Sequence, residues 1–400
     1  MKKREKPFNH RKSFMAGILS LSLLTVMAGA AVAPALGVIQ AYFSDTDQLF
    51  VQMIISIPAI FIVMTNFIFP RLCRVFGAKT LVMIGLLFYT AGGCAAGLFS
   101  NIAMILVMRA LVGVGVGIIM PLSTGLLAFY FPPRMQGKLM GYSSAMNQMG
   151  GVVATLLSGI LAGFSWRASF LVYLMGMISI VLCGIFMPNE KIHQHGEDGK
   201  KKKTGHVFRD NCVYIVAMFL LMTIFFIYPS NFAMETAAEG IIPQQLIAVI
   251  MAMMDFVAFI GGWTFVKVRR ICKENTKYLA PALFLVGYLL MALLGGWAGI
   301  LIGSAMIGFA NGAGIPFIIS EASVKAGKSA AVTVLPLISA ALYLAQFLCP
   351  FIMSAVTAAF GSLVPHLPYY FAALLAFIFC LWSSMIRTDK KGRKRAKAGR

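Results

Sequence analysis

Two charged residues stand inside long apolar runs, where an ionisable side chain could do chemistry. Asp255 lies near the middle of the run 244–266, and Arg109 lies in the run 102–131. A carboxylic acid held away from bulk water can take up and release a proton, whereas a buried arginine needs a partner or an aqueous cavity. The alternatives are an aspartic acid that stays protonated against a neighbouring helix, and a structural arginine bonded to helix-end carbonyls or reaching outward. We expect Asp255 to carry protons.

The helical face around Asp255 favours this interpretation. On a helical wheel Asp255 shares a stripe with Ala248, Ala252 and Gly262. Side chains this small are typical of a packed or cavity-lining face rather than one turned to lipid.

Six uncharged polar residues lie at a similar depth in their apolar runs. Singly, each is more typical of a hydrogen bond between helices than of a ligand contact. Together they predict the lining of a substrate cavity, to which the 26 methionines and 32 phenylalanines could add adaptable apolar surface. The six are Asn147, Gln148, Tyr228, Asn311, Tyr343 and Gln346.

Membrane-spanning helices must position these residues. The chain is 60% hydrophobic and 12% charged, and apolar runs of about 20 residues, enough to cross roughly 30 Å of hydrocarbon, recur throughout it. Backbone groups cannot stay unpaired in lipid, so we predict an all-α membrane protein with twelve transmembrane helices. The runs are 14–38, 48–69, 79–98, 102–131, 138–162, 168–188, 211–233, 244–266, 278–297, 299–323, 330–357 and 366–386.

The chain has a net charge of +21, and its positively charged residues fall mainly on one predicted side of the membrane. With the N-terminus inside, 32 of the 34 lysines and arginines fall in inner segments, and the exceptions are Arg109 and Arg167. The predicted outer loops carry acids instead, namely Asp45, Asp47, Glu235 and Glu239. This distribution predicts cytoplasmic termini and a multi-pass protein of the cell membrane, such as the bacterial inner membrane. The basic tails are expected to lie against anionic lipid rather than nucleic acid, because no aromatic residues are interleaved with them.

Two stretches 195 residues apart share a pattern of glycines that ends on a proline. They read RALVGVGVGIIMP from Arg109 and SAMIGFANGAGIP from Ser304. Small residues permit close helix packing, and a proline can bend a helix. The corresponding positions are Gly113 with Gly308, Gly117 with Gly312, and Pro121 with Pro316.

The repeat divides the chain into two six-helix bundles. The only long polar interior segment is 189–210, so the predicted domains are 1–188, a cytoplasmic linker at 189–210, and 211–400 with its basic tail. Two halves of the same topology form parallel repeats, which predict a binding site near the bilayer midplane between them. A signal peptide ending near Pro34 is the alternative for the N-terminus, but its cleavage would break this symmetry.

The arrangement resembles the major facilitator superfamily over nearly the whole chain. After the second run, Gly77 and Lys79 stand where this family has a glycine and a basic residue, although Pro70 and Arg74 replace its usual glycine and aspartate. RALVGVGVG matches the arginine-and-glycine pattern of helix 4, and WRASF, from Trp166, matches a signature between helices 5 and 6.

The fifth run resembles the drug/proton antiporter branch in the spacing of Gly141 and Gly150, but the Gly-Pro of that pattern is Ala154-Thr155 here. The resemblance implies a secondary active transporter that works by alternating access. It favours proton-coupled efflux of a small organic solute, with Asp255 as the proton carrier and Arg109 as an electrostatic element. Uptake of a small organic anion or nutrient, and a membrane sensor or scaffold that does not transport, remain alternatives.

The remaining motifs do not indicate an enzyme. We expect a monomer that needs no cofactor or metal. Its expected partners are a small-molecule substrate, protons and the lipid bilayer. EASVKAGKS, from Glu321, lacks the first glycine of a phosphate-binding loop, and no strand precedes it. HQHGED, from His193, is interpreted as solvated linker, and no cysteine lies in an outer loop where a disulfide could form. Near the inner end of the tenth run, Glu321 is predicted to pair with Lys325 one turn on and to act as a gate or anchor.

Overall fold

The computed structural model describes residues 8–188, 204–240, 242–294, 296–360 and 364–384. This part of the chain contains helices and no strands, which confirms the predicted fold class. Ten helical segments within it are long and apolar enough to cross a membrane. One of them, Leu246–Leu293, contains two helices, and a shorter apolar helix lies at Leu367–Ser383, so each predicted run overlaps a helix among the described residues.

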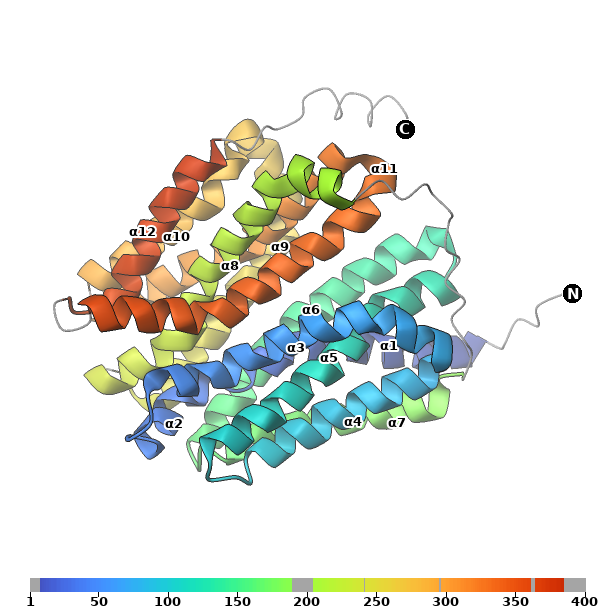
Figure 1. Ribbon diagram of the computed structural model, residues 1–400, viewed down its shortest axis with the longest axis horizontal. Coiled ribbons are helices and arrows are strands. Elements are labelled where there is room, and N and C mark those ends of the chain that lie inside the picture. Colours follow the sequence, from blue (N-terminus) through green and yellow to red (C-terminus); the bar gives the residue numbers. More distant parts are fainter. Residues whose placement is uncertain (1–7, 189–203, 241, 295, 361–363, 385–400) are drawn as a thin grey trace, which may run out of the picture. The chain divides into compact units, whose positions relative to one another are not determined.

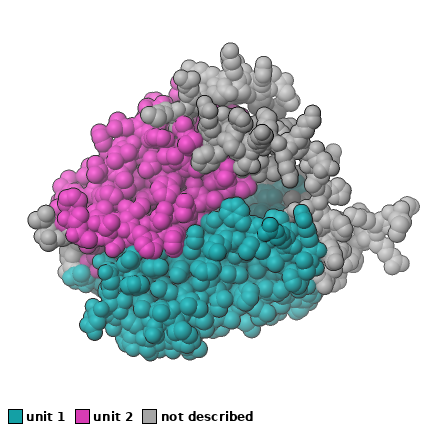
Figure 2. Space-filling view, in the orientation of Figure 1, with its two compact units in different colours: residues 1–194, 236–252 teal, residues 195–235, 253–400 magenta. Residues whose placement is uncertain are grey.

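The chain forms two compact units, which Figure 2 shows in different colours. Unit 1 comprises residues 1–194 and 236–252, and unit 2 comprises residues 195–235 and 253–400. Residues 236–252 therefore belong to unit 1, although they lie in the second half of the chain.

Unit 1 is built mainly from the helices of the first half, and they run alongside one another in Figure 1. Helix α5 packs against α3 and α4, and α1 packs against α6. Asp47 and Asn101 begin α3 and α5, because their side chains accept hydrogen bonds of 2.8 Å from the backbone two residues on. The elements are α1 (Phe8–Ala30), η1 (Ala33–Ala35), α2 (Leu36–Tyr42), α3 (Gln48–Val75), α4 (Ala78–Ala96), α5 (Ile102–Tyr130), α6 (Pro133–Ala162), η2 (Ala168–Leu174) and α7 (Met175–Phe186).

Unit 2 holds most of the second half, and in it α10 packs against α11 and α12. The tenth and eleventh predicted runs are one continuous helix, α11, whose two candidate spans are Gly296–Lys325 and Val334–Phe360. Helix α8 begins at Thr204, so the last residues of the predicted linker, 204–210, are helical. The elements are α8 (Thr204–Glu239), α9 (Gln244–Cys272), η3 (Lys273–Asn275), α10 (Thr276–Leu293), α11 (Gly296–Phe360) and α12 (Leu367–Ser383).

The repeated glycines are points where helix backbones meet. A Cβ atom placed on Gly113 of α5 would lie 2.4 Å from Pro58 O of α3. In the second copy, a Cβ on Gly308 of α11 would lie 2.2 Å from Met254 O of α9. No side chain fits at such distances, so both pairs of helices need glycine there. The repeat seen in the sequence thus corresponds to the same helix contact in each unit.

We predict that Gly308→Ala lowers the midpoint of thermal unfolding by about 2–10 °C, because overpacking costs about 1–3 kcal/mol and backbone atoms cannot move aside. Gly141→Ala is the matched control, since a Cβ at Gly141 would have nothing within 4 Å. Unfolding of the purified protein followed by intrinsic fluorescence measures both. Equal midpoints for the two variants would contradict the packing assigned to Gly308.

Candidate functional site

Arg109 of α5 is completely buried, with 0% of its surface exposed. Its Nε donates to Ile54 O of α3 at 2.7 Å, and its terminal nitrogens donate to Ala28 O of α1 and to the Tyr173 hydroxyl of η2. The Tyr173 hydroxyl also donates to Ala28 O, at 2.7 Å. One guanidinium therefore joins four elements of unit 1.

Both carbonyl acceptors lack the backbone donor that a continuous helix would supply. Ile54 lies four residues before Pro58, and proline has no N–H. Ala28 lies in the last turn of α1, where carbonyls have no intrahelical partner and the helix dipole favours a cation. Arg109 thus donates hydrogen bonds to backbone carbonyls for which lipid has no donor. This is the structural role that the sequence analysis named as the alternative to a part in proton movement. Its part in proton movement stays a prediction.

Ser304 of α11 stands in the second copy of the repeat where Arg109 stands in the first. Its Oγ lies 2.8 Å from the hydroxyl of Tyr228 in α8, and both residues are buried. Unit 2 therefore has a neutral hydrogen bond at the position where unit 1 has a cation.

Asp255 lies in α9, half-buried, one residue beyond the Met254 carbonyl that meets Gly308. Tyr228 of α8 and Ser304 of α11 form a hydrogen-bonded pair in unit 2, and Asp255 of α9 lies within electrostatic range of Tyr228. We call these three residues the Asp255 cluster. The sequence analysis had assigned Asp255 and Tyr228, but not Ser304, to a site.

The predicted cavity residues of unit 1 are Asn147 and Gln148 on α6, both half-buried. Asn147 is hydrogen-bonded to the hydroxyl of Thr25 on α1, with 2.7 Å between Asn147 Oδ1 and Thr25 Oγ1. Ser22 and Ser143 form a second such contact of 2.6 Å between the same two helices. Asn147 therefore joins helices, and a ligand contact there stays a prediction.

The other predicted cavity residues of unit 2 lie on α11. Asn311 is 7% exposed, and its Oδ1 is buried without a hydrogen-bond partner in the described structure. Such an atom is costly to bury unless water or a ligand satisfies it. Tyr343 and Gln346 lie in the later part of the same helix, beyond Val334.

The loop residues of the family resemblance have helix-end roles. Gly77 is the residue before α4, and Lys79 Nζ donates to Gly184 O in the last turn of α7 at 2.5 Å. Because Pro188 follows Gly184 by four residues, this carbonyl too lacks a backbone donor. Lys79 therefore caps α7 and ties it to α4.

The remaining motif positions differ in their contacts. Gly150 of α6 approaches α1 so closely that a Cβ there would lie 2.0 Å from Leu23 O, whereas Gly141 faces open space. In α5, Gly117 packs near Thr65 of α3, and Pro121 lies within the helix one turn further on. Gly117 and Gly150 are thus packing positions, and Gly141 is not.

Glu321 has a partner on another helix that the sequence analysis did not name. Glu321 is 2% exposed and forms an ion pair with Arg269 of α9, which also donates to Ser320. Lys325 Nζ lies 5.3 Å from the centre of the Tyr214 ring. The pairing of Glu321 with Lys325 stays a prediction, and the ion pair with Arg269 joins α11 to α9.

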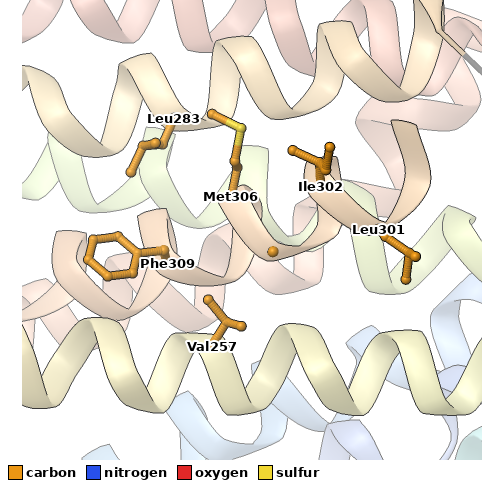
Figure 3. A pocket seen from close by; sticks show the side chains of 7 residues that line it. Val257, Leu283, Leu301, Ile302, Met306 and Phe309 are labelled. Carbon is orange, nitrogen blue, oxygen red and sulfur yellow. The ribbon is translucent and has the colours of Figure 1, made fainter. Parts of the chain in front are cut away.

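No group of three or more metal-binding side chains occurs among the described residues, and His193–Asp198 lies outside them. Unit 2 also has an apolar hollow on α9, α10 and α11, shown in Figure 3. It offers no hydrogen bond or charge to a solute, so it is not part of the candidate site. Its lining residues are Val257, Leu283, Leu301, Ile302, Ala305, Met306 and Phe309.

Sequence reasoning missed Tyr173 and Arg269. Tyr173 is an uncharged residue in an apolar run, and nothing local marks it as the partner of a residue 64 positions away. The repeat could have pointed to Arg269. It lies 195 residues after Arg74, which is the same offset that separates Gly308 from Gly113.

Taken together, the long apolar helices and the repeated helix contacts indicate a multi-pass membrane protein. The chain matches the Major Facilitator Superfamily over residues 18–350 and belongs to that family.

Curated relatives are similar over parts of their length. Multidrug resistance protein 3 of Bacillus subtilis (strain 168) is 23% identical over 285 residues, which cover 64% of this chain and 53% of the relative. The cis,cis-muconate transport protein of Acinetobacter baylyi is 28% identical over 133 residues, 33% of this chain and 32% of the relative. The chain thus spans about half of the first relative and a third of the second.

Solved structures share the fold. A bacterial homologue of the human lysosomal transporter Spinster, in an inward-facing and unoccupied conformation, has a TM-score of 0.75 at 14% identity, with 95% of this chain and 98% of the other covered. A variant of the nucleoside transporter NupG has a TM-score of 0.74 at 12% identity, with 93% and 99% covered.

We predict that Arg109→Lys and Arg109→Gln both lower the free energy of unfolding by about 3–5 kcal/mol, because one ammonium cannot bond three separated acceptors. Thermal unfolding measures this, with Arg71→Lys at an exposed position as the control. In a Pro58→Ala background, Ile54 O regains a backbone donor, so Arg109→Gln should cost less. If Arg109→Lys unfolded with the same free energy as the wild type, the positive charge alone, and not the set of hydrogen bonds, would account for the stability.

A second prediction concerns the buried ion pair. Arg269→Gln leaves the Glu321 carboxylate without its cation and should destabilise the protein more than Arg269→Gln combined with Glu321→Gln does. Lys325→Gln should be nearly neutral. The thermal unfolding midpoints of the wild type and the three variants measure this. A larger drop in midpoint for Lys325→Gln than for Arg269→Gln would show that Lys325 is the main partner of Glu321.

Proposed function

We propose that this protein is a secondary active transporter that exports small amphipathic organic solutes by alternating access, in exchange for protons. Asp255 is the proton carrier in this proposal. The observation that carries it is the half-buried carboxyl of Asp255 in the middle of an apolar helix long enough to cross a membrane. An intramembrane acid is costly to keep and is by default functional.

Arg109 contributes a fixed charge in this proposal. All its described partners belong to unit 1, and two of them are backbone carbonyls, so its hydrogen bonds give it little freedom to move. A charge held in this way sets a constant electrostatic field, whereas a carboxylic acid can change its charge with each cycle. We therefore assign the alternating charge to Asp255 alone.

The proposed direction of transport comes from a relative, and the proposed class of solute comes from the polar side chains. The name of the Bacillus subtilis relative refers to multidrug resistance, which favours export of varied organic compounds. The polar lining would come from Asn147, Gln148, Asn311, Tyr343 and Gln346, whose amide and hydroxyl groups bond solutes without requiring a charge.

A second candidate is uptake of a small organic anion, which the name of the muconate-transporting relative favours. Counterflow separates the two. Vesicles loaded with unlabelled cis,cis-muconate should take up labelled muconate only if the protein carries such anions. A sensor or scaffold would instead lose signalling on mutation of Asp255 while no solute moves.

We predict that Asp255→Asn abolishes dye transport driven by an imposed pH gradient in proteoliposomes, because the amide cannot bind and release a proton. A fluorescent amphipathic dye such as ethidium is the probe. Asp45→Asn, at an exposed position in the loop between α2 and α3, is the control and should transport normally. Unchanged pH-driven transport in Asp255→Asn would remove this residue from the coupling role.

A further inference from the structure

Two buried tyrosine hydroxyls bond backbone carbonyls on the first helix of each half of the chain. In unit 2, the Tyr288 hydroxyl of α10 donates to Ile224 O of α8 at 2.6 Å. In unit 1, the Tyr173 hydroxyl of η2 donates to Ala28 O of α1 at 2.7 Å. A phenol therefore supplies a helix carbonyl with a second donor in both units.

The two carbonyls occupy matching places in the repeat. Pro229 of α8 follows Pro34 by 195 residues, which is the offset of the glycine repeat. Ile224 lies five residues before Pro229, and Ala28 lies six residues before Pro34. A proline leaves the carbonyl four residues before it without a backbone donor. Both carbonyls thus lie within one helical turn of such an interruption.

The two tyrosines reach these carbonyls from different helices. Tyr288 stands 195 residues after Gly93 of α4. A Cβ atom placed on Gly93 would lie 2.1 Å from Cγ of Tyr173, so the Tyr173 ring fills the space that a side chain at position 93 would need. The aromatic ring beside each tyrosine keeps its repeat position, because Tyr89 and Phe284 are also 195 residues apart. The phenol therefore comes from non-equivalent elements, whereas its target is equivalent.

The first helices also differ in the number of donors that they need. Helix α1 ends at Ala30, whereas α8 is continuous through Pro229. The last carbonyls of a helix have no partner within it, so the end of α1 needs more donors than the interruption in α8. Arg109 adds such a donor in unit 1, and Ser304, at the same repeat position, bonds the side chain of Tyr228 instead. This difference accounts for a charge in only one copy of the repeat.

We propose that Tyr288 is the positioning residue of the Asp255 cluster. Its hydroxyl holds the turn of α8 between Ile224 and Tyr228, and Tyr228 carries the hydroxyl that bonds Ser304. A regular α-helix joins the N–H of Tyr228 to Ile224 O, and this N–H also lies within hydrogen-bonding range of the Tyr288 hydroxyl. Loss of that hydroxyl therefore changes the backbone that aims Tyr228. This inference rests on the proposed function for its effect on transport.

The first test observes Tyr228 in the folded protein. Incorporation of fluorotyrosine at the 12 tyrosines gives fluorine NMR signals, and the signal that disappears in Tyr228→Phe is that of Tyr228. Tyr288→Phe keeps the ring and removes only the hydroxyl, and it should shift or broaden the Tyr228 signal. Tyr173→Phe removes the related hydroxyl of unit 1 and should leave that signal in place. An unmoved Tyr228 signal in Tyr288→Phe would overturn the proposal.

Thermal unfolding is a second test that needs no label. Tyr288→Phe should lower the unfolding midpoint by about 2–8 °C, because a buried carbonyl loses its hydroxyl donor. In a Pro229→Ala background α8 can restore its regular hydrogen bonds, so the loss should be about half as large or less. Tyr278→Phe, half-buried on the same helix, is the control and should leave the midpoint unchanged.

Equal losses with and without Pro229→Ala would contradict the role assigned to the Tyr288 hydroxyl. If Tyr288→Phe alone does not fold, recovery of folded protein in the Pro229→Ala background is the equivalent supporting result. Failure to recover there counts against the proposal.

Transport then tests the link to Asp255. Tyr228→Phe should shift the pH of half-maximal transport, and Tyr288→Phe should shift it in the same direction. The double variant should shift no further than Tyr228→Phe alone, because Tyr288 acts through Tyr228. Additive shifts would overturn the positioning role. A moved Tyr228 signal with an unchanged pH profile in all variants would refute the proposed function alone, whereas pH-dependent transport with an unmoved signal would refute the positioning alone.

Discussion

The hydrogen bonds of Arg109 to Ile54 O and Ala28 O are the interaction on which unit 1 depends. Lipid offers no hydrogen bonds, so each carbonyl left without a donor by a proline or a helix end needs one from the protein. Arg109 meets this need for α3 and α1, and Lys79 meets it for the end of α7. The basic side chains that the sequence marks as unusual therefore hold helices whose backbone hydrogen bonding is interrupted.

The two copies of the repeat keep the same packing but differ in charge. Gly113 and Gly308 bring equivalent helices together, yet Arg109 is replaced by Ser304, which bonds Tyr228 without a formal charge. Unit 2 has an acid on α9, at Asp255, in addition to the ion pair of Glu321 with Arg269. We interpret this difference as a division of roles, in which the fixed cation stabilises one unit and the acid of the other is available for proton exchange.

The sequence predicts the helical fold well, because hydrophobic length and the positive-inside distribution follow from the bilayer itself. It also predicts the glycine contacts, since a 195-residue repeat constrains both units at once. The partners of Arg109 were not predictable by name, because backbone carbonyls are present at every residue and only the fold shows that those of Ile54 and Ala28 meet at one guanidinium. The ion pair of Glu321 with Arg269 was missed for a related reason: spacing along one helix is visible in a sequence, whereas the approach of Arg269 from another helix is not.

The central claim is that solute and proton movements are coupled through Asp255. The most direct measurement applies a solute gradient alone, with equal pH on both sides, and follows the internal pH of proteoliposomes with a trapped fluorescent indicator. The account predicts that the wild-type protein moves protons against the flow of solute and that Asp255→Asn moves none. Equal proton movement in the two proteins, or solute flow in the wild type without any change of internal pH, would contradict it.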